Sequence, residues 1–184
     1  HCLAGPLAEI FTQLLSVAAV PEEWKQAIFT PVFTKGAAGT VSNYRPISLT
    51  CVSCKIMERV ISQQMCRHFN DNHILHKAQH GFVKGHSTCT NMLESMNDWT
   101  LAINHRCGVT VAYIDFSRAF DSVSHKKLTD VRLKSYGIAG DLLNWLRIFL
   151  FRRTHQTRVG IELSGVAKLL SGVIQGSTIG PLMF

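Results

Sequence analysis

Apolar residues recur every three or four positions in three stretches of the first half of the chain, which is the spacing of one helical face. The first stretch follows Pro6, which suits a first helical turn, and Pro21 is expected to end that helix. Ser87 and Thr90 precede the third stretch, and either hydroxyl suits the N-cap. β-branched and aromatic residues after Pro21 are typical of a strand. The pattern therefore predicts helices over residues 7–18 and 52–65, a third helix through Leu93, Met96 and Trp99, and a strand over 27–33.

The clearest strand pattern of the second half is the continuous apolar run at 109–116, which is broken near its end by Asp115. Such a run is typical of a central strand buried on both faces. The carboxylate of Asp115 is then expected at the end of an interior strand, held in a fixed place.

Helices and a hairpin are predicted after this run. Ser124 is expected to cap a helix that ends at Tyr136–Gly137, and a further helix is predicted over 141–151. Strands at 157–163 and 166–170 are predicted to pair around Ser164–Gly165, and a glycine-rich turn at 172–181 is expected to open a last helix. Helices and strands are mixed without regular βαβ alternation, which predicts an α+β fold.

Composition places the chain among folded proteins. It has 184 residues, 46% of them apolar and 17% charged, so it lacks the low hydrophobicity of disordered chains. Its longest apolar runs are far shorter than the ~20 residues of a membrane helix, so no transmembrane span is expected.

The charge is unevenly distributed. The formal net charge is +7. Residues 118–158 carry three acids (Asp121, Asp130 and Asp141) and nine bases (Arg118, Lys126, Lys127, Arg132, Lys134, Arg147, Arg152, Arg153 and Arg158). Clustered positive charge suits a polyanion such as nucleic acid, and a solvated basic face is the alternative.

The six cysteines leave two alternatives to free thiols. A disulfide framework is not needed by a chain of this size and hydrophobicity. Cys51, Cys54, Cys66 and His68 have spacing like that of a zinc site, but the first three fall on or beside a predicted helix rather than on two loop-borne pairs. Reduced thiols in an intracellular protein are the favoured interpretation. The chain begins at His1 and is expected to be a piece of a longer one.

Two segments have the residue types of a catalytic or phosphate site. A carboxylate such as Asp115 suits a hard divalent cation, whereas capping of the next turn is its structural alternative. Aspartyl-phosphate phosphatases need a second Asp two residues after the first, and Ser117 stands at that position, so that class is excluded. The turn at 172–180 could cradle phosphates, but it has no Lys and is therefore not a P-loop.

Five ordered motifs resemble one family. They are Asn43-Tyr-Arg-Pro-Ile-Ser-Leu49, Gln79-His-Gly-Phe82, Tyr113-Ile-Asp-Phe-Ser-Arg-Ala-Phe-Asp121, Ser171-Gly-Val-Ile-Gln-Gly-Ser177 and Gly180-Pro-Leu-Met-Phe184. The series resembles the reverse transcriptases of non-LTR (LINE-type) retrotransposons. The resemblance implies the fingers and partial palm of a right-hand polymerase, without the thumb and part of the palm sheet. Residues 1–107 would be mainly fingers with flanking helices, and 108–184 partial palm.

The resemblance also implies an activity, which is addition of dNTPs to a DNA primer 3′-OH on an RNA template with two Mg²⁺ ions. Asp115 matches the first metal-binding, catalytic carboxylate. The residues that match nucleotide-binding positions are Lys35 and Arg45 on the triphosphate, Phe120 as the aromatic gate under the sugar, and Gln175 and Gly176 against the nascent base pair. Tyr44, Ser117 and Asp121 belong to the motifs as supporting residues. The basic segment 125–158 would contact the template–primer backbone.

The sequence also departs from the family pattern. Val83 and His86 stand where relatives usually carry Arg, Thr34 stands where a second Lys is common, and Ile174 replaces a usual Pro. The family's aromatic-x-Asp-Asp hairpin lies downstream of Phe184, so we expect this piece to lack polymerase activity, since one carboxylate does not hold two Mg²⁺ ions. A catalytically dead nucleic-acid-binding module and a non-functional element remnant are the alternatives. No membrane or protein partner is implied.

Overall fold

The computed structural model describes residues 3–184, and the chain divides into two compact units. The larger unit comprises the chain up to Cys66 together with Arg118–Phe184, and the smaller unit is Arg67–Ser117. Both units contain helix, and the larger unit adds a sheet, so the predicted α+β class is confirmed.

The larger unit contains the following elements in chain order: α1 (Ala4–Ser16), α2 (Glu22–Lys25), β1 (Gln26–Phe33), the 3₁₀ turn η1 (Val41–Asn43), β2 (Tyr44–Leu49), most of α3 (Val52–Asp71), the 3₁₀ turn η2 (Phe120–Ser122), α5 (His125–Lys127), the π-helical turn η3 (Leu128–Arg132), α6 (Leu133–Ser135), α7 (Gly140–Leu150), β3 (Arg153–Val159), β4 (Glu162–Leu163), β5 (Ala167–Leu169) and α8 (Gly180–Met183).

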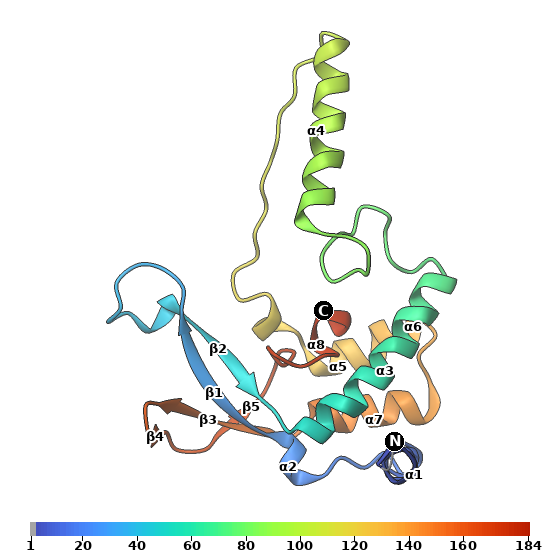
Figure 1. Ribbon diagram of the computed structural model, residues 1–184, viewed down its shortest axis with the longest axis vertical. Helices are drawn as coiled ribbons and strands as arrows, with labels where there is room; N and C mark the ends of the chain where they lie inside the picture. The colour runs from blue at the N-terminus through green and yellow to red at the C-terminus, as the bar shows by residue number, and fades with distance from the viewer. Residues whose placement is uncertain (1–2) are drawn as a thin grey trace. The chain divides into compact units, whose positions relative to one another are not determined.

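The sheet is built around β1. Its antiparallel neighbour β2 pairs along its length, from Ile28↔Leu49 to Phe33↔Tyr44. On its other side β3 runs parallel to it, with Gln26 opposite Thr154. The two long strands β1 and β2 form the twisted hairpin of Figure 1. The strand predicted over 27–33 is therefore confirmed.

The hairpin predicted around Ser164–Gly165 is wrong. β3 instead turns back at Gly160, whose φ of +62° suits a residue without Cβ, and pairs with β4 through Val159↔Glu162. β5 then pairs antiparallel with the start of β3, not with β4. Ser164 lies at the break, where its hydroxyl accepts a hydrogen bond from the backbone N–H of Thr157 at 2.9 Å.

Helix α7 forms the centre of the core. Trp145, Leu146 and Phe149 are fully buried, and the rings of Trp145 and Phe149 stack at 5.0 Å. The indole N–H of Trp145 donates to the carbonyl of Ala19 at 3.1 Å, which ties the turn after α1 to α7. Because the chain turns there, α1 ends at Ser16, before it reaches Pro21.

Arg153 is buried where β3 leaves α7. Its guanidinium donates to the carbonyls of Phe149 at 3.0 Å and Trp24 at 2.8 Å and lies 4.8 Å over the Phe149 ring. Burial lowers the pKa of Arg153 from its usual value. A residue counted with the basic patch from sequence thus joins α2, α7 and β3 inside the fold.

The predicted helices at 52–65 and 124–137 both exist, with details that the pattern did not show. Ser124 caps the second by accepting the backbone N–H of Lys127, and Gly137 ends it with φ +81°. Helix α3 buries Cys54, Met57, Glu58 and Ile61. Several of the apolar residues that marked α3 in the sequence are instead exposed, including Val52 at 72%.

In the smaller unit, α4 (Thr88–Asn104) begins with a capping box between Ser87 and Thr90. Both residues predicted as alternative caps therefore take part. Like every helix within residues 3–184, α4 is not long and apolar enough to cross a membrane.

The buried central strand predicted at 109–116 is wrong. These residues have no regular secondary structure and are exposed, with Tyr113 at 88% and Ile114 at 80%. Figure 1 shows the segment as a trace that returns along α4. A strand needs a neighbour for its backbone N–H and C=O groups, and no strand of the described chain pairs with this segment.

Candidate active site

The glycine-rich segment 171–180 is hydrogen-bonded to the η2 loop, which comprises η2 and Val123 directly after it. The backbone N–H groups of Gly172 and Val173 donate to the carbonyls of Val123 and Phe120, both at 2.8 Å. Gly172 has φ +91°, and a Cβ there would lie 2.9 Å from the Cα of Asp121. Only glycine fits this approach without displacing the loop.

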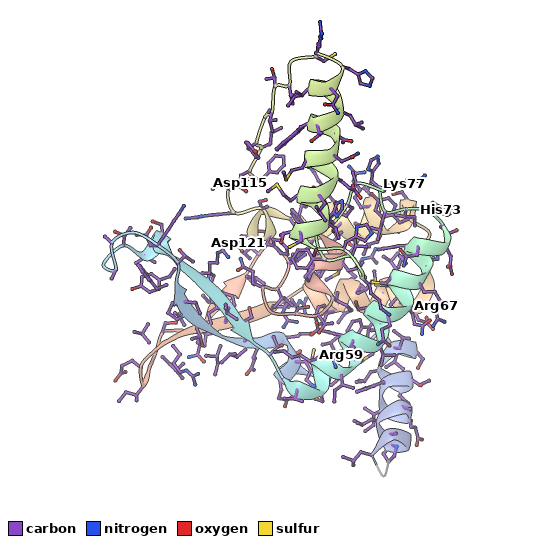
Figure 2. The ribbon with its side chains drawn as sticks, turned by 45° about the horizontal axis from the view of Figure 1, so that its top comes forward. Arg59, Arg67, His73, Lys77, Asp115 and Asp121 are labelled. Carbon is purple, nitrogen blue, oxygen red and sulfur yellow. The ribbon has the colours of Figure 1, made fainter. Side chains whose placement is uncertain are left out.

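Gln175 and Asp121 join the same two segments through their side chains. The amide Nε2 of Gln175 donates to Oδ1 of Asp121 at 3.0 Å, and the Ser171 hydroxyl donates to the Asp121 carbonyl at 2.9 Å. Figure 2 labels Asp121, which is exposed. Gln175 is half-buried. The hydrogen bond to Asp121 therefore fixes the direction of the Gln175 side chain, which is partly exposed to solvent.

The turn also lies directly against β2. The N–H of Ser48 donates to the carbonyl of Gln175 at 2.9 Å. Gly176 has φ +100°, and a Cβ there would lie 2.7 Å from the Ser48 carbonyl oxygen. Ser48, Asp121 and Gln175 line one pocket, together with Ala27, Phe29, Pro46, Arg153, Thr154, His155, Leu169, Val173 and Ile174.

Glu58 holds the far side of the turn from inside α3. Its carboxylate is fully buried and accepts the hydroxyl of Ser177 and the backbone N–H groups of Thr178 at 2.7 Å and Ile179 at 3.3 Å. These are donors at the start of α8 that would otherwise be unsatisfied. The turn is therefore set by three separate segments: the η2 loop, β2 and α3.

Phe120 is half-buried at the start of η2. Its ring stacks on Phe184 with centroids 4.6 Å apart and planes 16° apart. Because the Phe120 carbonyl also holds Val173, the ring is connected to the glycine turn by backbone and side chain alike.

Arg45 and Lys35 lie along the β1–β2 hairpin. Arg45 is exposed on β2, opposite Val32, on the strand whose Ser48 meets the turn. Lys35 is exposed in the loop beyond the terminal pair Phe33↔Tyr44. At ~3.4 Å per residue, Lys35 lies on the order of 13 Å or more along the hairpin from Ser48.

The structure therefore brings together Phe120, Gln175, Gly176 and the strand that carries Arg45. It does not bring Lys35 to the turn. Asp115 belongs to the smaller unit, where it is exposed on the irregular segment 107–117, so the expected strand-end position of its carboxylate is wrong.

Sequence reasoning missed Glu58 as a site residue. A signal existed: Glu58 interrupts the buried stripe of α3 formed by Cys54, Met57, Ile61 and Met65. An acid within an apolar stripe must find donors or lose its charge. Asp121 was expected to be a supporting residue of its motif. Its carboxylate acts in this way by accepting the hydrogen bond that orients Gln175.

Comparison with known proteins agrees with the motif order. Residues 34–184 match the family described as reverse transcriptase (RNA-dependent DNA polymerase). The chain belongs to this reverse transcriptase family. The resemblance to non-LTR retrotransposon enzymes drawn from the motifs is thereby confirmed, as the following relatives show.

The chain is 30% identical over 179 residues to the probable RNA-directed DNA polymerase from transposon BS of Drosophila melanogaster, covering 97% of this chain and 20% of that protein. It is also 30% identical over 179 residues to the RNA-directed DNA polymerase from mobile element jockey of the same species, covering 97% and 19%. The retrovirus-related Pol polyprotein from type-1 retrotransposable element R2 of Popillia japonica is 27% identical over 167 residues, covering 90% and 23%. The chain thus spans about a fifth of the length of the first two.

The family implies Mg²⁺, and the described residues of this reverse transcriptase chain do not fit a complete site for it. Within residues 3–184 no three His, Cys, Asp or Glu side chains gather into a group that could hold a metal ion. The Asp121 carboxylate already accepts a hydrogen bond from Gln175, and Asp115 is exposed on an irregular segment of the smaller unit. The described residues of this chain therefore do not by themselves complete a site for two Mg²⁺ ions.

Proposed function

We propose that this chain forms the nucleotide-facing part of an RNA-directed DNA polymerase that adds dNTPs to a primer 3′-OH on an RNA template. In this proposal residues 1–107 are mainly fingers with flanking helices, and residues 108–184 are partial palm. Family membership supports the general activity. The division into fingers and palm rests on the order of the motifs.

The observation that carries the proposal is the fixed glycine turn. Gln175 is oriented by Asp121, while Gly176 leaves bare backbone beside β2. A preorganised turn surface with an oriented amide suits contact with a base pair of any sequence, and glycine at position 176 lets this turn pack directly on β2. We assign the nascent base pair to this surface.

Phe120 is proposed as the gate under the sugar. Its stacking on Phe184 holds the ring in place, and a fixed ring excludes a 2′-OH by its volume rather than by a hydrogen bond. The same site would thus accept a dNTP and reject an rNTP.

Arg45 and Lys35 are proposed to bind the triphosphate. Both are exposed on the hairpin, and an Arg fork neutralises phosphate oxygens bidentately while a Lys acts as a point charge. We propose that Arg45 binds the phosphate nearer the turn and Lys35 a more distant one, which their separation along the hairpin supports.

Asp115 is proposed as the first metal-binding carboxylate of the whole polymerase. Two Mg²⁺ ions, when bound, stabilise the attacking and leaving oxygens of the transfer. One carboxylate does not supply the several oxygen ligands that each ion needs. We therefore propose that the 184-residue chain binds nucleotide and nucleic acid but does not itself extend a primer.

The test is dNTP-dependent binding to a fluorescent DNA primer annealed to an RNA template, followed by primer extension with Mg²⁺. We expect the complementary dNTP to bind more tightly than the other three, Arg45→Ala to weaken it about tenfold, and no extension to occur. Arg67→Ala, on α3 (Figure 2), is the matched control and should leave dNTP binding unchanged. Binding that ignores dNTP identity would contradict the assignment of the turn, and extension abolished by Asp115→Ala would contradict inactivity of the chain.

A second candidate function is sequence-independent nucleic-acid binding alone. A pocket of about 650 Å³ in the larger unit has Lys126, Arg152 and Lys168 in its lining beside the ring of Phe151. Cations next to an aromatic ring suit a single strand, with phosphates on the cations and a base on the ring. Affinity for single-stranded RNA that falls steeply with salt, with no effect of dNTP, would favour this function.

A further inference from the structure

Cys51 is the N-cap residue of α3. Its carbonyl accepts the first helical hydrogen bond, from the N–H of Lys55 at 3.1 Å. Its sulfur lies 3.1 Å from the Ser53 hydroxyl. The Ser53 hydroxyl above all, followed by the backbone groups of Cys54 and Ser53, lowers the pKa of the Cys51 thiol. Cys51 is half-buried, so small molecules reach it.

Cys54 has the opposite environment, one turn along the same helix. It is fully buried, and its sulfur donates to Oε1 of Glu58 at 3.4 Å. Burial first, and then the charge of Glu58, raise the pKa of the Cys54 thiol. A half-buried sulfur whose thiol pKa is lowered thus stands beside a fully buried sulfur whose thiol pKa is raised.

The spacing of the two residues permits a bond between them. Positions three apart at a helix start have Cα atoms about 5 Å apart by helix geometry, within the ~4.4–6.8 Å that a disulfide spans. Both thiols are free in this structure.

We propose that Cys51 and Cys54 form a thiol–disulfide exchange site, in which Cys51 is the attacking sulfur and Cys54 the resolving one, with small disulfides such as glutathione disulfide as co-reactant. The Cys51 thiolate attacks one sulfur of that disulfide, forms a mixed disulfide and releases one glutathione thiolate. Cys54 passes its proton to Glu58, attacks the Cys51 sulfur and releases the second thiolate, which takes up the proton. Two protein thiols are oxidised and one glutathione disulfide is reduced to two thiols.

The exchange acts on the glycine turn through Glu58. The carboxylate that accepts the Cys54 thiol also accepts Ser177, Thr178 and Ile179. Formation of the disulfide removes the thiol proton and turns Cys54 Sγ toward Cys51, so Glu58 loses one of its donors. The oxidised chain is therefore expected to hold the turn less firmly.

The first experiment is alkylation of the reduced wild-type chain with iodoacetamide, read by peptide mass. We expect Cys51 to react about tenfold faster than exposed Cys107 at neutral pH, and Cys54 to react only on unfolding. Equal rates at Cys51 and Cys107 would overturn the attacking role of Cys51. This measurement needs no variant.

The second experiment exposes the chain to glutathione disulfide and then to reduced glutathione. Tryptic peptide 36–55 contains both cysteines and no other, and we expect it to lose two hydrogens and to regain them on reduction. Cys54→Ser should instead retain glutathione on Cys51, whereas Cys89→Ser should behave as wild type. Glutathione that stays on Cys51 in the wild-type chain would overturn the resolving role of Cys54.

The coupling to the turn is tested by thermal unfolding of the two redox forms. We expect the midpoint of the oxidised chain to lie about 2–4 °C below that of the reduced chain. An unchanged midpoint would overturn the coupling. None of these readouts uses a nucleotide, so they are independent of the proposed polymerase function.

Discussion

The side-chain amide of Gln175 donates to Oδ1 of Asp121 at 3.0 Å, although the two residues are 54 positions apart. The bond joins the glycine turn to the last residue of the motif that contains Asp115. Because each partner belongs to a different sequence motif, their contact is the point at which two motifs become one site.

Loss of this bond should weaken nucleotide binding more than it weakens the fold. For Gln175→Ala we expect dNTP affinity to fall roughly fivefold, since one partly exposed hydrogen bond contributes about 1 kcal/mol. The measurement is dNTP titration against labelled primer–template. Gln156→Ala on β3, which removes a hydrogen bond to Ser164, is the control, and an equal loss in both variants would refute the special position of Gln175.

Gly172→Ala should destabilise the larger unit. The new Cβ would lie 2.9 Å from backbone atoms of Phe120 and Asp121, and φ +91° is strained for any L side chain. We expect a loss of about 2–4 kcal/mol in the free energy of unfolding, measured by urea denaturation. Gly165→Ala, where a Cβ meets nothing within 4 Å, should change stability by less than about 1 kcal/mol.

Glu58→Ala should loosen the start of α8. The buried hydroxyl of Ser177 and the N–H of Thr178 would lose their acceptor, and each such group costs about 1–3 kcal/mol when left unpaired. We expect the free energy of unfolding to fall by roughly 3 kcal/mol. Glu58→Gln keeps one acceptor oxygen, so its free energy of unfolding should fall less. Glu23→Ala, at an exposed position, should leave the free energy of unfolding almost unchanged. Similar losses of stability in Glu58→Gln and Glu58→Ala would show that the negative charge of Glu58, and not its ability to accept hydrogen bonds, stabilises the turn.

The Asp130–Arg147 ion pair should make stability depend on acid pH. Arg147 Nη2 lies 2.6 Å from Asp130 Oδ1, and the hydrogen bond from Arg147 above all lowers the pKa of Asp130. Because the folded-state pKa is below the unfolded value of about 3.9, the contribution is present above that pH and is lost as pH falls through the lowered pKa. Asp130→Asn should therefore be less stable than wild type at pH 7 and equal to it in strong acid. A difference that is the same at every pH would contradict the linkage.

Removal of the Phe120 ring should relax sugar selection. For Phe120→Ala we expect the ratio of dNTP to rNTP affinity to fall, because the proposed barrier to a 2′-OH is the volume of the ring. Phe33→Ala, on the exposed end of β1, is the control. An unchanged ratio, with the chain still folded by circular dichroism, would count against the gate.

Local pattern was sufficient wherever neighbours in the chain decide the structure. The helix spacing of α1, α3 and α7, the caps at Ser87 and Ser124, and the strand β1 all followed from residues within a few positions. The five motifs, taken in order, were enough to identify the reverse transcriptase family.

Tertiary structure decided what depends on distant partners. Strand pairing is one case: β5 pairs with β3 rather than across Ser164–Gly165, and residues 109–116 have the composition of a central strand but no described strand beside them. A strand pattern states which residues suit burial, whereas only a hydrogen-bonded neighbour makes them a strand.

The candidate site shows the same contrast between what local sequence predicts and what contacts between distant segments decide. Sequence named Phe120, Gln175 and Gly176 because each lies in a recognisable motif. It did not show that Glu58 holds the turn, that Arg153 is buried, or that Asp121 orients Gln175, since those contacts join segments far apart in the chain. Burial of a charged group becomes favourable only when the fold supplies its partners, and the order of residues along the chain does not record which partners those are.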